Sequence, residues 1–350
     1  MDLPCGTFKE NYAQDMAVIH TKLQWLILFT FFVFLFTLPL YAGDRWLSII
    51  TVIGITVITV HGLNILTGYC GQISLGHPAF MAVGAYTSAL LCANLGWSYW
   101  AALPCAALAA GIVGILFGLP SLKVKGFYLI MTTLAAQFII IWVILQLRNL
   151  TGGVDGLAAA KPKIAGITLS SKQIWFYLVM MITCLATFFA KNLVRTRVGR
   201  VFIAIRDNDL AAEVMGVNLF YYKLQAFFIG CMFAGVAGSL LVHYVGIASP
   251  EQFTLMDSVW YLGMLIVGGM GSTIGAIFGT VFLRLLDELI VLLSPALASA
   301  FPVIAVQAAA SLGLIAHALV IILFLIFEPR GLAHRWEITK KYFRLWPFSY

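Results

Sequence analysis

The residues that could do chemistry are few, and none is arranged as a catalytic or metal site. The histidines within apolar stretches have no second metal ligand one helical turn away, and they are His61, His77, His243 and His317. We interpret each as a buried histidine satisfied within the fold. The six cysteines contain no CxxC pair and are interpreted as small packing residues. The sequence therefore predicts no catalytic residue, no metal site and no cofactor.

The chain also lacks the GxxxxGK[ST] loop that cradles ATP phosphates in many proteins. It is not expected to hydrolyse ATP alone, so a partner would have to supply any coupling to ATP. Ion-driven carriers instead place carboxylates within the membrane. Here only Asp287 and Glu288 qualify, with Arg284 one turn away, and we expect structural pairing among them rather than an ion site.

Composition defines the class of protein that must position these residues. Hydrophobic residues make up 62% of the 350 residues, charged residues 10%, and the mean hydropathy is +0.98. These values exclude a water-soluble globular domain and predict an all-α polytopic membrane protein surrounded by lipid. The net charge of +7 does not indicate nucleic-acid binding, because the basic residues are spread over several short loops.

Apolar runs long enough to cross a bilayer predict about ten transmembrane helices. Eight runs are clear: 23–42, 47–67, 73–95, 99–119, 127–147, 174–190, 224–245 and 301–327. The region 259–293 is too long for one span and is divided at 268–272, where glycines cluster. Residues 23–332 then form one transmembrane domain between an N-terminal tail, 1–22, and a basic C-terminal tail, 333–350.

The distribution of charge favours both termini on the cytoplasmic side. With ten spans, fifteen of the 21 Lys and Arg residues fall on that side and five on the other, while Arg284 lies within a span. The same count divides the chain into two five-span halves of opposite orientation, as in transporters built from inverted repeats. A polar break follows the second span, at 68–77, and another follows the seventh, at 249–258.

The long polar segment 197–217 lies between the two halves on the cytoplasmic side. Asp207 and Asn208 can cap a short amphipathic helix that ends at Gly216, and Leu210, Val214 and Val217 fall on one of its faces. We expect a basic turn before this helix, with Arg195, Arg197 and Arg200. Lipid headgroups, the chain's own spans or another protein could cover the apolar face.

The break at 68–77 is a candidate lining or gate of a transport pathway. Its glycines and Pro78 interrupt helical hydrogen bonding, and irregular backbone near a membrane requires protein or a water-filled cavity around it. The candidate residues, including polar positions on the fifth span, are Gly68, Gly71, Gln72, Ser74, Gly76, His77, Thr132, Thr133 and Gln137. A tight turn satisfied by its own side chains is the alternative, and the polar residues of the fifth span could equally bond across helices.

Small-residue spacing indicates close helix packing. Gly271, Gly275 and Gly279 form a GxxxGxxxG pattern, and Gly114 and Gly118 form GxxxG. Both patterns allow neighbouring backbones to approach. We interpret them as packing surfaces, although a glycine seam also suits helices that slide during gating.

Four segments, in order along the chain, resemble the LivM-type permeases of branched-chain amino acid ABC importers. They are residues 62–86, which include the break, residues 151–157 (TGGVDGL), the polar segment with its continuation to 223, and residues 327–332 (FEPRGL). The resemblance implies a second, usually different permease subunit, two cytoplasmic ATP-binding subunits and an external solute-binding protein. It also implies the bacterial cytoplasmic (inner) membrane as the location.

The resemblance further implies a coupling helix that contacts an ATP-binding subunit. Such helices often carry Glu-Ala-Ala followed after three residues by Gly; Ala211, Ala212 and Gly216 match, while Leu210 stands at the glutamate position. Either Asp209 or Glu213 could then be the acid that meets the ATPase. The candidate coupling residues are Arg200, Arg206, Asp207, Asn208, Asp209, Ala211, Ala212, Glu213 and Gly216.

The leading hypothesis is a permease subunit, not itself an enzyme, that imports branched-chain or other hydrophobic amino acids by using partner ATPases. An ABC permease for urea or short amides is the first alternative. A stand-alone secondary carrier is the second, with the amphipathic helix lying on the anionic inner leaflet. The acids at 207, 209 and 213 disfavour that location, because an anionic surface repels them.

Overall fold

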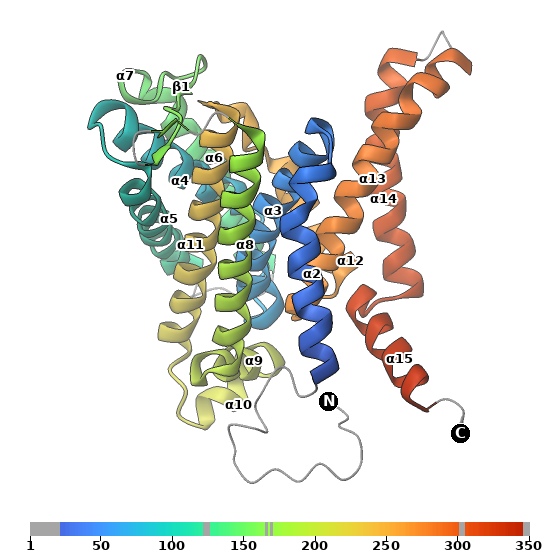
Figure 1. The fold of residues 1–350 in the computed structure, drawn as a ribbon. Coiled ribbons are helices and arrows are strands. Elements are labelled where there is room, and N and C mark those ends of the chain that lie inside the picture. The colour runs from blue at the N-terminus through green and yellow to red at the C-terminus, as the bar shows by residue number, and fades with distance from the viewer. Residues whose placement is uncertain (1–21, 122–126, 165–166, 169–170, 301–304, 346–350) are drawn as a thin grey trace. The chain divides into compact units, whose positions relative to one another are not determined.

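The computed structural model describes residues 22–121, 127–164, 167–168, 171–300 and 305–345, and Figure 1 shows the fold. The predicted tail 1–22 lies almost entirely outside these residues. The chain divides into two compact units, 1–49 and 50–350. The first holds α2 (Lys22–Tyr41) and the start of α3 (Asp44–Leu63). The second holds the rest of the chain and is described by itself.

Helices dominate the second unit, as the apolar composition predicts. After α3 come a π-helical turn, η1 (Asn64–Tyr69), and then α4 (His77–Asn94), α5 (Tyr99–Ser121), α6 (Phe127–Gln146), α7 (Arg148–Thr151), α8 (Lys172–Arg195), α9 (Arg197–Asp207), α10 (Asp209–Val214), α11 (Leu219–Val245), η2 (Pro250–Gln252), α12 (Leu255–Gly268), α13 (Thr273–Ala300), α14 (Ala305–Phe327) and α15 (Gly331–Leu345).

Each predicted apolar run corresponds to a helix, which confirms the all-α membrane class. Six helices among the described residues are long and apolar enough to cross a membrane, or up to seven if α14 and α15, bent by 49° at their junction, count as one span. The predicted division of 259–293 agrees with the break between α12 and α13. Because α12 has 14 residues and α13 carries Arg284, Asp287 and Glu288, the total of ten spans stays a prediction.

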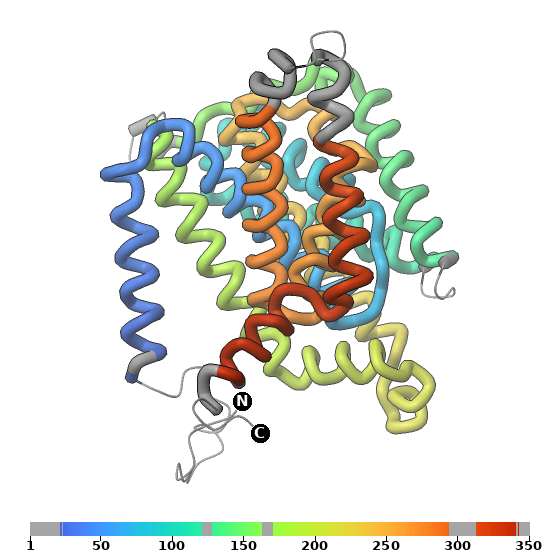
Figure 2. The backbone as a smooth tube through the Cα atoms, turned by 90° about the vertical axis from the view of Figure 1, so that its right-hand side faces the viewer, coloured from blue at the N-terminus to red at the C-terminus, as the bar shows by residue number. Residues whose placement is uncertain are grey.

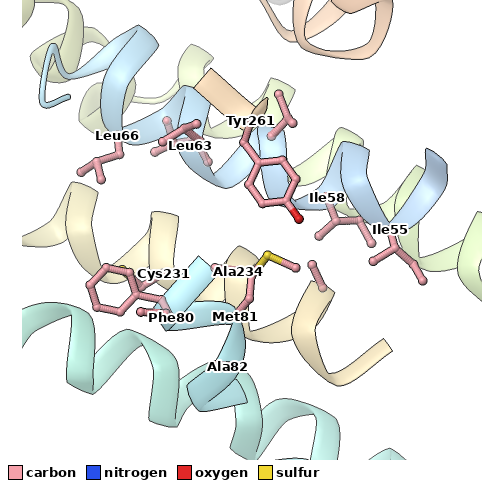
Figure 3. Packing of buried hydrophobic residues seen from close by; sticks show 14 of the residues in the cluster. Ile55, Ile58, Leu63, Leu66, Phe80, Met81, Ala82, Cys231, Ala234 and Tyr261 are labelled. Carbon is pink, nitrogen blue, oxygen red and sulfur yellow. The ribbon is translucent and has the colours of Figure 1, made fainter. Parts of the chain in front are cut away.

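The core of the second unit forms where α11 packs against α3, α4 and α5. Small residues set the spacing of these helices: Gly235 of α11 faces Gly84 of α4, Gly230 faces Gly62 of α3, and Gly114 of α5 faces Cys231. Figure 3 shows side chains from α3, α4, α11 and α12 meeting in this core. The close approach of these helices buries the apolar side chains between them.

Two short sheets complete the described fold. β1 (Leu157–Ala158) pairs antiparallel with β4 (Ile247–Ala248), and β2 (Lys163–Ile164) pairs antiparallel with β3 (Ile167–Thr168). Within the second unit, α7 and β1 lie at the end opposite to α9 and α10 (Figure 1). The two parts of the chain predicted on opposite membrane faces are therefore at opposite ends of the unit.

The glycine pattern at 271–279 divides into a packing surface and a turn. A Cβ atom on Gly279 would collide with the carbonyl oxygen of Met264, and one on Gly275 would lie 2.6 Å from the Gly268 carbonyl oxygen. These two glycines therefore allow α13 to approach α12 closely. Gly271 lies before α13 and has φ +76°, which favours glycine, so its role is in the turn.

We predict that Gly279→Val destabilises the second unit, because its side chain would meet the backbone of α12 with no room to move. Overpacking of this kind costs about 1–3 kcal/mol or more. The expected result is a lower melting temperature and loss of the monodisperse peak of detergent-purified protein in size-exclusion chromatography.

Gly313→Val in α14 is the matched control, because a Cβ atom at Gly313 has no neighbour within 4 Å. This control variant should resemble the wild type. Equal behaviour of the two variants would contradict the assignment of Gly279 to a packing surface.

Candidate functional site

The polar segment 197–217 forms two helices, not the single helix and preceding turn expected from the sequence. Arg197 and Arg200 lie on α9, whose N-cap is Thr196. Asn208 separates α9 from α10 in an extended conformation, and its Oδ1 accepts a hydrogen bond of 3.0 Å from Ala211 N. The predicted capping role of Asn208 is confirmed, whereas Asp207 is the last residue of α9.

One side of this segment packs on the fold and the other is open to solvent. Phe202, Ile205 and Ala212 are buried. Leu210, Val214 and Met215 are 63%, 87% and 83% exposed, and we call these three residues the apolar cap. Of the predicted apolar face, Leu210 and Val214 are therefore left uncovered by the described part of the second unit, whereas Val217 packs against its core. Figure 2 shows this segment, in yellow-green and yellow, at the end of the unit beyond the helix bundle.

The two candidate acids have different surroundings. The Asp209 carboxylate lies 3.7 Å from Lys223 Nζ, whereas Glu213 is exposed. Glu213 also borders a groove of about 540 Å³ that runs beside the apolar cap and is lined by Gly216, Val217, Asn218, Leu219, Phe220 and Lys223. Gly216 has φ +85° and no atom within 4 Å of a Cβ position, so its surroundings are open.

The two candidate arginines of α9 point to different partners. Arg200 Nη1 donates to Arg195 O over 3.4 Å at the surface. Arg206 instead donates from Nη1 to the Gly68 carbonyl oxygen at 3.1 Å and from Nε to Asp207 Oδ1 at 2.9 Å. Arg206 thus joins the polar segment to the break at 68–77.

That break is largely buried. Gly68, Gln72, Ser74, Gly76 and His77 are buried, whereas Gly71, with φ +73°, is exposed.

Side chains of α6 accept hydrogen bonds from backbone N–H groups in the break and at the start of α4. Leu75 N donates to Thr133 Oγ1 at 3.1 Å, and Ala79 N donates to Gln137 Oε1 at 2.9 Å. Thr132 instead donates to the Tyr128 carbonyl of its own helix. Thr133 and Gln137 are therefore brought to the break, and Thr132 is not.

The second polar break, 249–258, reaches the same place. Gln137 Nε2 donates to Phe253 O at 2.8 Å, and Ser258 Oγ donates to Leu75 O at 2.5 Å. The polar loops of the two predicted halves therefore meet beside Gln137. These contacts supply hydrogen bonds that irregular backbone requires in a membrane protein, and a role of the break in a pathway stays a prediction.

Three of the four candidate histidines have a hydrogen-bond partner, whereas neither ring nitrogen of the buried His77 has one among the described residues, contrary to the expectation for this histidine. His61 lies 3.0 Å from Thr187 Oγ1, His243 lies 2.8 Å from Ala160 O, and His317 lies 2.9 Å from Gly313 O. The partner of Asp287 is His317, at 3.0 Å, and Arg284 donates to Thr56. Arg284 and Asp287 thus each contact another helix, and the expected pairing with Glu288 stays a prediction.

The described cysteines and acidic residues form no metal-binding constellation. No group of three or more His, Cys, Asp or Glu residues that could hold a metal occurs among the described residues. Burial raises the pKa of the Cys70 thiol to about 12, so this thiol within the break is protonated at neutral pH and suits packing.

The sequence did not single out Asn64, which lies within an apolar run. Its side chain bonds to both Gly271 N and Ser272 O, so it joins the end of α3 to the turn before α13. The presence of an amide side chain within an otherwise apolar span could have indicated this contact, because a buried polar group requires a hydrogen-bond partner.

Comparison with known proteins agrees with this architecture. Residues 45–325 match the family described as branched-chain amino acid transport system / permease component. The chain is 32% identical over 293 residues to the high-affinity branched-chain amino acid transport system permease protein LivM of Escherichia coli K12, covering 77% of this chain and 69% of that protein.

More distant relatives include an archaeal and a second bacterial permease. The chain is 28% identical over 177 residues to the probable branched-chain amino acid transport permease protein LivM of Methanocaldococcus jannaschii, covering 50% of this chain and 51% of that protein. It is 30% identical over 217 residues to the autoinducer 2 import system permease protein LsrC of Salmonella typhimurium LT2, covering 57% and 58%.

No solved structure matches the chain. The family match covers most of the sequence, including the break at 68–77, the segment 197–217 and the turn before α13. The chain therefore belongs to the family of branched-chain amino acid transport system permease components.

Proposed function

We propose that this chain is the transmembrane permease subunit of an ABC importer that moves branched-chain or other hydrophobic amino acids into the cytoplasm. The observation that carries the proposal is the apolar cap on a short, polar helical segment, in a chain of this permease family. Exposed apolar groups on a polar helix mark an interaction surface. ATP hydrolysis is assigned to the partner subunits, and no cofactor is assigned to this chain.

The partner proposed for the apolar cap is an ATP-binding subunit. Leu210, Val214 and Met215 would enter a hollow of that subunit, and Gly216 would leave room for its backbone. An ABC importer of this kind contains two ATP-binding subunits, a second permease subunit, which the resemblance suggests is a different one, and an external solute-binding protein.

The proposed orientation places the segment 197–217 in the cytoplasm of a bacterial cell and the β1–β4 pair outside the inner membrane. The C-terminal helix α15 lies at the same end of the second unit as α9 and α10 (Figures 1 and 2). Its place agrees with a cytoplasmic C-terminus, and the distribution of Lys and Arg favours a cytoplasmic N-terminus as well.

Of the two candidate acids, Glu213 suits contact with the ATP-binding subunit better. It is exposed beside the apolar cap, whereas the Asp209 side chain is 24% exposed and already faces Lys223. A carboxylate that is paired within the fold has less to gain from a partner's cation. We therefore assign the ATPase contact to Glu213 and an internal role to Asp209.

Transport would follow from movement of this segment. Closure of the two ATP-binding subunits would displace α10 and α9, tilt the attached helices, and open a cavity between the permease subunits alternately to each side. Hydrophobic amino acids suit the apolar walls that such a cavity would have, and the solute-binding protein would do most of the selecting.

Cross-linking tests the proposed contact. Single cysteines at 209 and 213, in a variant without native cysteines, are treated with a short bifunctional thiol reagent together with an ATP-binding subunit that carries cysteines along its permease-facing hollow. We expect efficient cross-links from Glu213→Cys and weak ones from Asp209→Cys, measured by gel mobility. Absence of cross-links at both positions, with uptake intact when the ATP-binding subunit is deleted, would eliminate the permease proposal.

A bulky group at Gly216 should block docking without disturbing the fold. A Cβ atom at this position meets nothing within 4 Å, so Gly216→Trp would project an indole toward the partner. The expected result is that the permease inserts and purifies normally but no longer co-purifies with the ATP-binding subunit.

Gly246→Trp controls for backbone strain in this experiment. Gly246 also has positive φ and open surroundings, but it caps α11 at the opposite end of the unit. Loss of co-purification in both variants would assign the effect to strain and count against a docked segment.

The cargo is tested with the assembled importer in proteoliposomes. We expect uptake of radiolabelled leucine, isoleucine or valine that requires ATP and the solute-binding protein, and a rise in melting temperature of that protein with the same amino acids. Urea and short amides serve as competitors. Uptake of urea without uptake of these amino acids would replace the proposed cargo, and uptake without ATP would indicate a secondary carrier.

A further inference from the structure

Two interruptions of the membrane helices are bonded to each other at the end of the unit that carries the polar segment. The first is the end of η1, at Gly68, and the second is the turn between α12 and α13. The Asn64 side chain accepts from Gly271 N at 2.9 Å and donates to Ser272 O at 3.0 Å. Tyr69 adds a 3.0 Å hydrogen bond to Thr273. These three hydrogen bonds therefore make one junction from two breaks.

Arg206 lies against this junction. Its Nη1 donates to Gly68 O, and a Cβ atom on Gly271 would lie 2.7 Å from the same nitrogen. A Cβ atom on Gly71 would lie 3.1 Å from Arg206 Cγ. Glycine on both sides thus leaves the space that the arginine side chain occupies, and the contact depends on residues from three separate parts of the chain.

The chemistry of the contact suits a guanidinium group. At the end of η1, Cys70 N bonds to Ile65 O and Gln72 N bonds to Leu66 O, so the Gly68 carbonyl lies beyond these last helical bonds. A cation at the C-terminal end of a helix is favourable, because the partial negative charge of the free carbonyls is concentrated there. The Asp207 carboxylate accepts a hydrogen bond from Arg206 Nε, and Arg206 Nη1 is left to donate to Gly68 O.

Arg206 is also attached firmly to its own helix and, through it, to α10. The side chains of Phe202 and Ile205 on α9 are buried, and only Asn208 separates α9 from α10. A force on α10 therefore reaches Arg206 through one short helix. The partly exposed side chain, at 37%, can change its contacts without disrupting a closed core.

We propose that Arg206 is a positioning residue that transmits movement of the polar segment to the Gly68 and Gly271 breaks, and does not itself bind the ATP-binding subunit. This inference rests on the proposed function. When the ATP-binding subunits close, the Arg206 guanidinium moves with α9, and its hydrogen bond to Gly68 O is either kept or broken. Since Asn64 joins the two breaks, α3, α12 and α13 respond together.

The test compares Arg206→Ala, Arg206→Lys and the wild type in the complete importer, reconstituted in proteoliposomes with leucine as cargo. Three quantities are measured: co-purification of the ATP-binding subunit, ATP hydrolysis, and uptake. Arg206→Ala should retain co-purification and hydrolysis, while uptake per ATP falls by about tenfold, within the range of typical coupling between sites. The uptake per ATP of Arg206→Lys should lie between those of the wild type and Arg206→Ala. A single ammonium group cannot bond to Asp207 and to Gly68 O at the same time as the forked guanidinium does.

Arg197→Ala is the matched control, since Arg197 is an exposed arginine at the other end of the same helix. It should leave all three quantities unchanged. Normal uptake per ATP in Arg206→Ala would overturn the inference, and so would loss of co-purification, which would make Arg206 a docking residue. If Arg206→Ala does not accumulate, Arg206→Lys decides: a selective fall in uptake per ATP supports the inference and wild-type behaviour overturns it.

Failure of the proposed function is seen separately, in the wild type. A wild-type permease that neither retains an ATP-binding subunit nor takes up leucine would contradict the function itself. A wild type that does both, together with an Arg206→Ala variant of unchanged coupling, would contradict only the role of Arg206.

Discussion

The hydrogen bond from Arg206 to Gly68 O belongs to a general requirement of this fold: wherever a membrane helix is interrupted, its backbone groups need partners from protein. Lipid supplies none, so an interruption survives only where other elements reach it. In the second unit two interruptions occur near the same end, and each is met by side chains from elsewhere in the sequence. The requirement thereby connects segments that apolar packing alone would leave independent.

The partners at the two ends of the break at 68–77 differ in a way that suits different roles. Leu75 and Ala79 are held by Thr133 and Gln137, uncharged side chains buried on α6. Gly68 is held by a charged side chain from outside the membrane helices. Buried neutral contacts favour a fixed junction, while a half-exposed guanidinium can exchange its carbonyl partner for water at small cost. We therefore expect the 74–79 end to stay fixed while the Gly68 end responds to α9.

Glycine makes this arrangement possible in two distinct ways. Along α12 and α13, Gly268, Gly275 and Gly279 remove side chains so that two backbones touch. At the turn after α12, Gly271 supplies positive φ and space beside Arg206. Gly271, Gly275 and Gly279 belong to one sequence pattern, GxxxGxxxG, and periodicity alone predicted a packing role for all three. The structure distinguishes the two roles because α13 begins at Thr273, so that Gly271 lies in the turn while Gly275 and Gly279 lie on the helix.

Hydropathy and glycine clusters sufficed to predict the helical class, the positions of the helices and the two breaks, because burial in lipid constrains composition strongly. The division of 197–217 into two helices was not predictable from its amphipathic pattern, since it depends on Asn208 adopting an extended conformation between two stretches that are each compatible with helix. The orientation of the Arg206 side chain was also not predictable, because a sequence does not show which of several basic residues faces inward. Its partner is a backbone carbonyl 138 residues away, and such a partner leaves no side-chain signature.

The small size of α10 follows from the same physics. A helix of six residues is marginal alone, because nucleation costs more than so few hydrogen bonds return. Here the Asn208 cap, the buried Ala212 and the pairing of Asp209 with Lys223 hold it on one side, while the other side presents the apolar cap. A longer helix would gain stability from its own turns and could shift independently of α9. A short one keeps its shape only while attached, so displacement of the apolar cap must carry α9, and Arg206 with it.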